Sequence, residues 1–167
     1  VYILQDFGLL DYLQFDGYSY RLVPILTPYR SAWDIGRIDT DVAYPLLKDT
    51  LRYGNLADPG VNADYFVQYN LSASRAREAF ARVARKLLQE NQPDKAREML
   101  DRGLEVLPSP KIRYTDANTY PFIECYYLLE DYDKGDALLK DYAETLKEYI
   151  EYYLQFDGAQ AALVSDI

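Results

Sequence analysis

The sequence contains no histidine and only one cysteine, Cys125. Histidine is the commonest general base and the commonest metal ligand, so its absence removes both from the usual active-site chemistry. One cysteine cannot form a disulfide within the chain and leaves the redox compartment undecided; we expect it to pack as a small apolar residue between helices. We assign no catalytic residue, no metal ligand and no cofactor-binding residue, and we expect no cofactor.

Positive charge and long apolar runs are also scarce. The 167 residues include 18 lysines and arginines against 27 acids, a net charge of -9. Binding of a phosphate backbone needs clustered basic side chains, so we expect no nucleic-acid partner. The apolar runs are only a few residues long, whereas a bilayer span needs about 20, so we do not expect this chain to span a membrane. Because it opens on Val1 rather than methionine, we interpret it as a piece cut from a longer polypeptide.

The acidic residues divide the chain into two parts. Every acid before Glu78 is an aspartate, and all nine glutamates lie from Glu78 onward. Aspartate favours caps and turns while glutamate favours helix interiors, which places a boundary near Asn70 to Ser74. We predict a mainly α fold in which an irregular N-terminal half, residues 1–70 with one or two helices, packs on helical hairpins in residues 71–167 as one continuous core.

Turn residues and apolar spacing predict the individual elements. In the first part of the N-terminal half we expect a short helix at Leu9–Phe15, a short strand or extended arm at Tyr18–Ile25 and a loop at Thr27–Ile38. After the loop we expect a helix from Asp39 or Thr40 to about Tyr53, with Pro45 in its first turn. A helical turn or two should follow at Ala63–Tyr69. In the second half we expect four helices, which begin at Ser72 or Ser74, at Pro93, at Asp116 and at Tyr132. The last of them is predicted to present one apolar face made of Leu139, Tyr142, Leu146, Tyr149, Ile150 and Tyr153.

Residues 77–110 have the spacing of a tetratricopeptide unit, in which large residues alternate with small ones so that two antiparallel helices approach closely and a proline ends the pair. A second, looser copy lies 39 residues later, where Asp133-Lys134-Gly135 aligns with Asp94-Lys95-Ala96. This repeat signature consists of Phe80, Ala84, Leu87, Ala96, Leu100, Gly103 and Pro108.

The eighteen tyrosines can serve packing or recognition. Tyrosine rings stack on sugars and fill protein interfaces, but at helical core spacing a tyrosine buries its ring and lets its hydroxyl reach water. We predict packing for the helical set, and we predict that an aromatic patch in the N-terminal half stays exposed and serves as a docking surface. The helical set is Tyr126, Tyr142, Tyr149 and Tyr153, and the docking patch is Tyr18, Tyr20, Tyr29 and Trp33.

Two polar patterns have both a functional and a structural interpretation. Asp39-Thr40-Asp41 has the D-x-D spacing with which some glycosyltransferases hold a divalent metal, but acids are also favoured at a helix N-terminus, and we choose the cap. Arg21, Arg30 and Arg37 form a loose basic series that suits phosphate contact or ion pairing with nearby aspartates, and ion pairing is the simpler account.

Three blocks of the sequence carry a resemblance to a known family: GLLDYLQFDGYSYRLVP, IDTDVAYPLLKDTLRYGNLADPGV and IRYTDANTYPFIECYYLLEDYDKGDALL. Together with the repeat they resemble the soluble C-terminal region of bacterial polytopic glycosyltransferases of the protein O-mannosyltransferase type. The resemblance implies a domain on the extracytoplasmic, periplasmic face of a bacterial membrane, attached to a membrane domain that holds the catalytic carboxylates. It therefore transfers no catalytic residue to this chain.

Three functions follow as hypotheses. The first is a non-catalytic accessory domain that braces the membrane domain of its own polypeptide or holds a protein acceptor. The second is a free-standing helical-repeat adaptor, although two repeat units are fewer than the three or so that usually build a binding groove. The third is a sugar-binding module that uses the aromatic N-terminal half.

Overall fold

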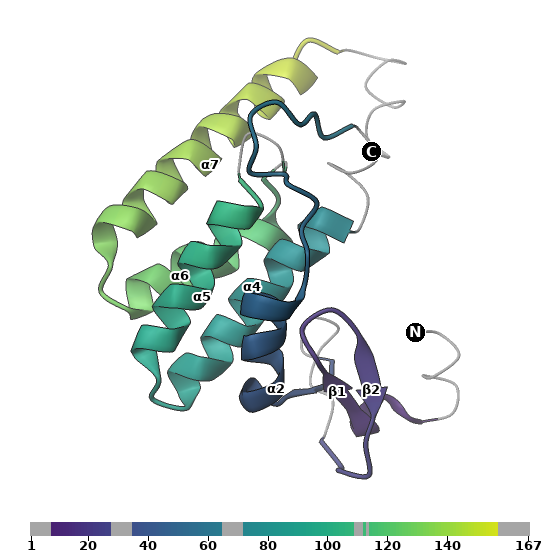
Figure 1. Cartoon of the computed structure of the whole chain (residues 1–167). Helices are drawn as coiled ribbons and strands as arrows, with labels where there is room; N and C mark the ends of the chain where they lie inside the picture. The colour runs from purple at the N-terminus through teal and green to yellow at the C-terminus, as the bar shows by residue number, and fades with distance from the viewer. Residues whose placement is uncertain (1–7, 28–34, 65–71, 109–111, 113, 157–167) are drawn as a thin grey trace. The chain divides into compact units, whose positions relative to one another are not determined.

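The computed structural model describes residues 8–27, 35–64, 72–108, 112 and 114–156, and over these the chain is mainly helical (Figure 1). The predicted mainly α class, with short strands in the N-terminal half, is confirmed. No helix among the described residues combines the length and the apolar character needed to cross a bilayer. The elements in chain order are a 3-10 turn η1 (Leu10–Tyr12), β1 (Leu13–Phe15), β2 (Tyr20–Leu22), β3 (Arg37–Ile38), α2 (Thr40–Pro45), a π-helical turn η2 (Leu46–Thr50), α4 (Ser72–Gln89), α5 (Pro93–Val106), α6 (Asp116–Leu128) and α7 (Tyr132–Tyr153).

The chain divides into two compact units, Val1–Arg113 and Tyr114–Ile167. The first contains the small sheet, α2 and the α4–α5 hairpin, and the second contains α6 and α7. The division into residues 1–70 and 71–167 expected from the sequence has its boundary beside residues 65–71, which lie outside the described part, and it stays a prediction.

Helices α4 and α5 form an antiparallel hairpin, as Figure 1 shows. The turn between them is tight because Asn91 takes a left-handed conformation, with φ of 57°, and the amide of Gln92 donates to the carbonyl of Leu87. Pro93 then begins α5 at a position where no helical amide partner is lost. Pro108 of the repeat signature is half-buried. The other members of the signature lie on the two helices and are all buried: Phe80, Ala84, Leu87, Ala96, Leu100 and Gly103. Alanine and glycine at three of these positions let the two helix axes approach closely.

A buried arginine fastens the start of α4 to the end of α5. The Arg77 side chain is fully buried, and its guanidinium donates to the carbonyls of Leu107 and Ile112. Leu107 is the C-cap of α5, where carbonyls have no helical partner and the helix dipole favours a cation. The guanidinium thereby supplies donors to backbone carbonyls at and beyond the end of α5.

The second unit is another helical pair. Thr115 caps α6 in a capping box with Asn118, in which the Asn118 amide donates to Thr115 Oγ1 over 3.3 Å and the Thr115 amide donates to Asn118 Oδ1 over 3.0 Å. At Gly135 a β-carbon would lie 3.4 Å from the Tyr127 ring, an ordinary van der Waals distance, so the packing of α7 on α6 does not require glycine at this position. Cys125 is fully buried, as expected from its small apolar character.

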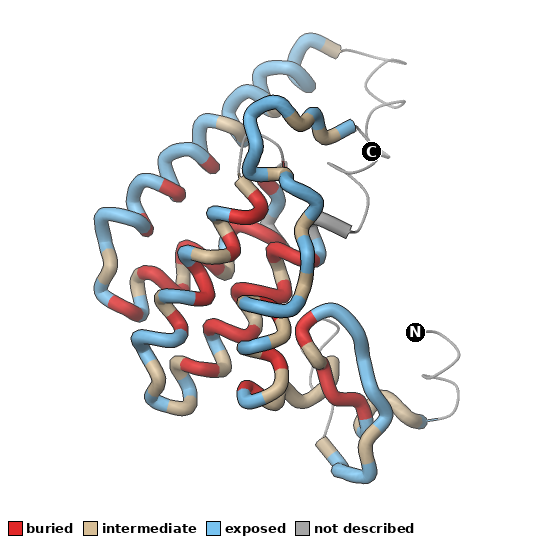
Figure 2. The backbone as a smooth tube through the Cα atoms, viewed as in Figure 1, coloured by how far each residue is buried: buried red, intermediate tan, exposed pale blue. Residues whose placement is uncertain are grey.

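The predicted face of α7 is wrong in part. Tyr142 is buried, but the other buried residues of α7 are Gly135 and Leu138, which are not part of the predicted face. The side chains of Leu139, Leu146, Ile150 and Tyr153 are exposed, and Figure 2 shows the C-terminal half of α7 as largely exposed. α6 has 13 residues and α7 has 22, so the C-terminal part of α7, with Leu146, Ile150 and Tyr153, extends past the helix it packs against. Length does not explain the exposure of Leu139, which lies between the buried Leu138 and Tyr142.

The predicted helix at Leu9–Phe15 is also wrong beyond its first turn. Residues 13–15 form β1, which pairs with β2 on one side and β3 on the other, so contacts distant in sequence outweigh local helical preference.

The predicted loop at Thr27–Ile38 ends in strand β3, and its residues 28–34 lie outside the described part. Residues 61–64 have no regular structure, and the rest of the predicted turn at Ala63–Tyr69 is not described.

The helix predicted to reach Tyr53 ends at Thr50 instead. Pro45 lies at the end of α2 rather than in its first turn, and it has no amide to donate to the preceding turn. From Leu46 the backbone hydrogen bonds span five residues instead of four, which makes a π-helical turn: the Leu51 amide donates to the Leu46 carbonyl over 3.0 Å. The chain then becomes extended at Leu51.

The close α4–α5 contact gives the first testable expectation. Replacing the fully buried Ala96 by leucine inserts three carbons into a packed contact and should lower the free energy of unfolding by about 1 to 3 kcal/mol. Urea denaturation measures the change. The same substitution at the exposed Ala137 is the control, and equal small effects at both positions would contradict a tight contact at Ala96.

Candidate functional site

The described residues of the N-terminal part form a small hairpin. Strands β1 and β2 pair antiparallel, with Leu13 opposite Leu22 and Phe15 opposite Tyr20. The two-residue loop at Gly17 and Tyr18 needs a left-handed first position, which Gly17 supplies with φ of 92°. A β-carbon at Gly17 would lie 2.9 Å from Leu47 Cγ, so this glycine also lets the hairpin pack on η2.

The hairpin leaves backbone groups at the edge of the sheet. The strand order is β2-β1-β3, so β2 is an edge strand. The Asp16 amide donates to the Ser19 carbonyl, and the Val23 amide donates to the Tyr12 carbonyl, which identifies these as hydrogen-bonded pairs. Since such pairs alternate along an antiparallel ladder, the amides and carbonyls of Tyr20 and Leu22 point away from β1. Among the described residues no strand pairs with this edge.

Apolar side chains gather on the same segment. All three residues of β2 are exposed, whereas all three of β1 are buried. We call the exposed apolar residues of this segment the hairpin patch: Tyr18, Tyr20, Leu22, Ile25 and Leu26, which are 40–62% exposed. Tyr18 and Tyr20 belong to the predicted docking patch, and the structure brings them together with three aliphatic residues that the sequence analysis did not select. Tyr29 and Trp33 lie outside the described residues.

Arg82 of α4 fixes the hairpin to the helical body. Its guanidinium donates to the Tyr20 hydroxyl over 2.9 Å and to the Ile35 carbonyl over 2.7 Å, and its central carbon lies 4.2 Å from the centre of the Phe15 ring. The Phe15 and Tyr20 rings are themselves 5.3 Å apart. One arginine therefore holds both strands of the hairpin and the segment that leads into β3.

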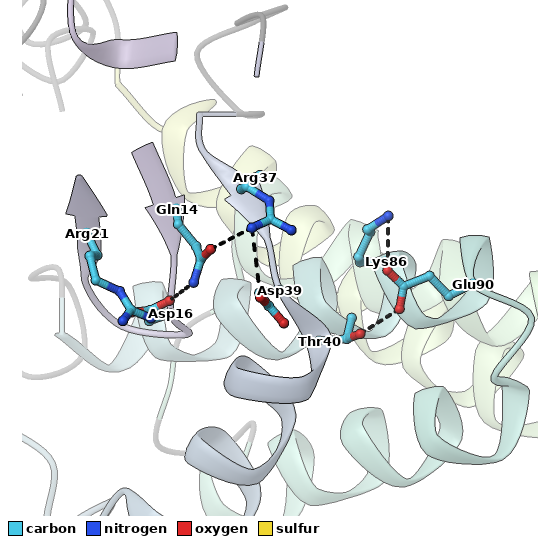
Figure 3. A network of polar contacts seen from close by, with 8 residues as sticks. All are labelled: Gln14, Asp16, Arg21, Arg37, Asp39, Thr40, Lys86 and Glu90. Carbon is cyan, nitrogen blue, oxygen red and sulfur yellow. Dashed lines mark hydrogen bonds and ion pairs between the residues drawn. The ribbon is translucent and has the colours of Figure 1, made fainter. Parts of the chain in front are cut away.

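A polar network supports the other side of the hairpin (Figure 3). The buried Gln14 donates to Asp16 over 2.8 Å and accepts from Arg37 over 2.9 Å. Arg21 pairs with Asp16 at 2.8 Å, and Arg37 lies 3.8 Å from Asp39. The described members of the basic series are thus engaged in ion pairs, while Arg30 lies outside the described residues.

The D-x-D pattern lies at the N-terminus of α2, where the dipole favours acids. Asp39 occupies the N-cap position, but its side chain makes no capping hydrogen bond, so the predicted capping role is only positional. Thr40 is not the cap either, because its hydroxyl donates to Glu90 over 2.5 Å, and Glu90 also pairs with Lys86 at 3.1 Å (Figure 3). Among the described residues no cluster of three or more potential ligands is placed to hold a metal ion.

A groove of about 520 Å³, which was not predicted from the sequence, lies between η2 and α5. It is lined by Lys48, Asp49, Glu98, Asp101, Arg102 and Glu105. Lys48 pairs with Glu98 at 2.5 Å, and Tyr44 donates to the same carboxylate. The hydrogen bond from Lys48 lowers the pKa of Glu98, and the hydrogen bond to Glu98 raises the pKa of Lys48. The groove was not predictable because its two walls, η2 and α5, are about fifty residues apart in the sequence.

The helical tyrosines divide between core and surface. Tyr126 and Tyr142 are buried, which confirms their predicted packing role, and Tyr149 is half-buried. Tyr153 is 38% exposed, and its ring contacts the Tyr152 ring with centroids 5.5 Å apart, so it lies at the surface rather than in the core as predicted.

Comparisons of the chain with family models, with curated proteins and with solved structures find no match.

Loss of the Arg82 anchor should release the hairpin. Because Arg82→Ala removes two hydrogen bonds and a ring contact, we expect the free energy of unfolding to fall by about 1 to 2 kcal/mol. Hydrogen exchange should accelerate at the amides of residues 13–16. Arg75→Ala, an exposed position on the same helix, is the control, and unchanged exchange in the Arg82 variant would contradict the anchoring role.

Glu78 on α4 gives an expectation for pH. Burial raises the pKa of its carboxyl, and the Arg82 and Arg75 charges lower it in part. Since the folded state then binds the proton more tightly than the unfolded chain, the contribution to stability is full below the unfolded pKa and is lost as pH rises through the folded pKa. Glu78→Gln should therefore stabilise the protein at neutral pH, and the gain should shrink towards about pH 4.

Urea titrations across this pH range measure the effect of Glu78→Gln. Glu144→Gln on the exposed surface of α7 is the matched control. A stability difference that does not change with pH would show that the charge of Glu78 is not responsible.

Proposed function

We propose that this chain is a non-catalytic accessory domain that docks through the hairpin patch on the membrane domain of its own polypeptide. The observation that carries the docking role is an exposed apolar segment on an edge strand whose backbone groups point outward. Such an edge invites pairing or coverage, because unpaired backbone groups and apolar side chains are both better satisfied in an interface. The resemblance of three sequence blocks to polytopic glycosyltransferases is the support for a membrane-embedded parent on the periplasmic face.

A permanent interface suits the hairpin patch better than transient capture of a protein acceptor. Lasting interfaces are the more apolar class, and the exposed side chains from Leu22 to Leu26 carry no charge. The patch is also held in place before docking, since Arg82 and the Gln14 network attach it to the rest of its unit. Little ordering entropy then opposes association.

The other hypotheses have weaker support. A sugar-binding role for Tyr20 competes with its existing contacts, because its hydroxyl accepts from Arg82 and its ring packs on Phe15. An adaptor groove made of repeats needs more units than the two helical pairs described here.

The complete reading frame provides the first test of the membrane context. We expect it to encode several apolar spans of about 20 residues upstream of the position of Val1. A complete frame without such spans would contradict the membrane part of the proposal and leave the docking role of the hairpin patch to be tested separately.

Photo-crosslinking in the full polypeptide tests the docking surface. A photoreactive residue in place of Leu22 should crosslink within the same polypeptide, to its membrane domain. A photoreactive residue in place of Leu128, an equally exposed leucine at the end of α6, is the control and should not. Equal crosslinking to the membrane domain from both positions would contradict docking through the hairpin. The absence of any protein crosslink from position 22 would contradict it as well.

A further inference from the structure

Helix α7 has an apolar face that extends beyond its partner helix. At 1.5 Å per residue, its 22 residues are roughly 33 Å long, against about 20 Å for the 13 residues of α6. The buried positions of α7 are Gly135, Leu138 and Tyr142. Beyond Tyr142 the described part of the helix has no buried side chain (Figure 2).

The exposed part of α7 is nevertheless patterned like a packing surface. At 100° per residue, one side of the helix carries a continuous row of apolar residues, which we call the α7 stripe: Leu139, Leu146, Tyr149, Ile150, Tyr153 and Leu154. Of the charged residues from 140 to 151, Lys140 and Lys147 flank the stripe, and the four acids lie on the opposite side: Asp141, Glu144, Glu148 and Glu151. Lys147 and Glu151 pair at 3.7 Å.

The stripe is large for a surface that faces water. Five of its members are 38–78% exposed, and Tyr149 is half-buried. Together they present roughly 600 Å² of apolar surface, at the upper end of what monomeric proteins expose in one patch. Complete coverage of two such surfaces would bury at most about 1,200 Å², which reaches only the lower end of the range for stable specific interfaces.

The central spacing of the stripe is symmetric on reversal. Leu146, Tyr149, Ile150 and Tyr153 are separated by three, one and three residues. An antiparallel copy of α7 related by a two-fold axis at Tyr149 and Ile150 therefore places Leu146 opposite Tyr153 of the copy and Tyr149 opposite Ile150 of the copy. The same patch serves both chains, as a two-fold interface requires, and the antiparallel helix dipoles attract.

We propose that two copies of this chain associate through the α7 stripe in an antiparallel, two-fold arrangement. The net charge of -9 does not oppose this contact locally, because the four acids from 140 to 151 lie on the far side of the helix. A lipid surface is the less favourable occupant, since helices that lie on membranes carry a basic polar face, whereas this one has four acids and two lysines from 140 to 151. The inference concerns a different surface from the hairpin patch and does not depend on the proposed function.

Sedimentation velocity of the full chain, from about 1 to about 100 µM, tests the association. We expect a concentration-dependent dimer, and we expect Leu146→Glu to weaken it at least about 10-fold because the charge would be buried at the centre of the contact. Leu128→Glu introduces the same charge at an exposed leucine outside the stripe and should leave the dimer intact. A monomer over the whole range, or equal weakening by both variants, overturns the proposal.

Cysteine crosslinking tests the arrangement of the two helices. Leu146→Cys mixed with Tyr153→Cys should form a mixed disulfide faster than either variant forms a disulfide with itself, and the buried Cys125 should not compete. Faster crosslinking of identical variants would overturn the antiparallel arrangement. Binding of the monomer to vesicles of phosphatidylcholine and phosphatidylglycerol, lost in Leu146→Glu, would instead assign the stripe to a lipid surface.

Discussion

The first unit depends on the surface of α4, which is built mainly from small residues. Ala76, Ala79, Ala81 and Ala84 are buried, and so are the larger Phe80, Val83 and Leu87 between them. Small side chains allow neighbouring backbones to approach, while the large ones fill the space that remains, which gives the dense packing of protein interiors. One helix can therefore contact α5, α2 and the hairpin at once.

Polar side chains on α4 and directly after it then decide where each neighbour lies. Arg77 of α4 donates to the carbonyls that follow α5, Arg82 of α4 donates to the hairpin, and Glu90, which follows α4, accepts from Thr40 at the start of α2. Exposed ion pairs contribute little free energy, but hydrogen bonds of a charged group to backbone carbonyls are stronger and directional. The apolar contacts thus supply most of the stability, and the charged side chains supply the geometry.

This division of roles explains why the hairpin patch is both exposed and well positioned. Strand β1 is buried on both sides of its sheet, whereas β2 is attached through β1, through the Tyr20 contacts and through the ion pair of Arg21 with Asp16. An edge strand held in this way presents its outward amides without any rearrangement. The part of the α7 stripe beyond Tyr142 is exposed for a different reason, which is that α7 is longer than α6. One surface offers backbone hydrogen bonds and the other offers side chains, so they suit different kinds of contact.

The sequence by itself determined the four helices α4 to α7 and the pairing of α4 with α5. Proline at the first position of α5, Thr115 before α6 and the 3.6-residue apolar period act locally, so the limits of α4 to α7 were predictable within a few residues. The burial of Ala84, Ala96 and Gly103 followed from their alternation with large residues.

Only the tertiary structure decided the strand β1, the exposure of the α7 stripe, the groove beside Lys48 and the polar contacts of Thr40 and Arg82. Each depends on a partner far away in the sequence or on the length of a neighbouring helix. Local propensity carries no information about either, because strand pairing and burial are properties of the assembled chain.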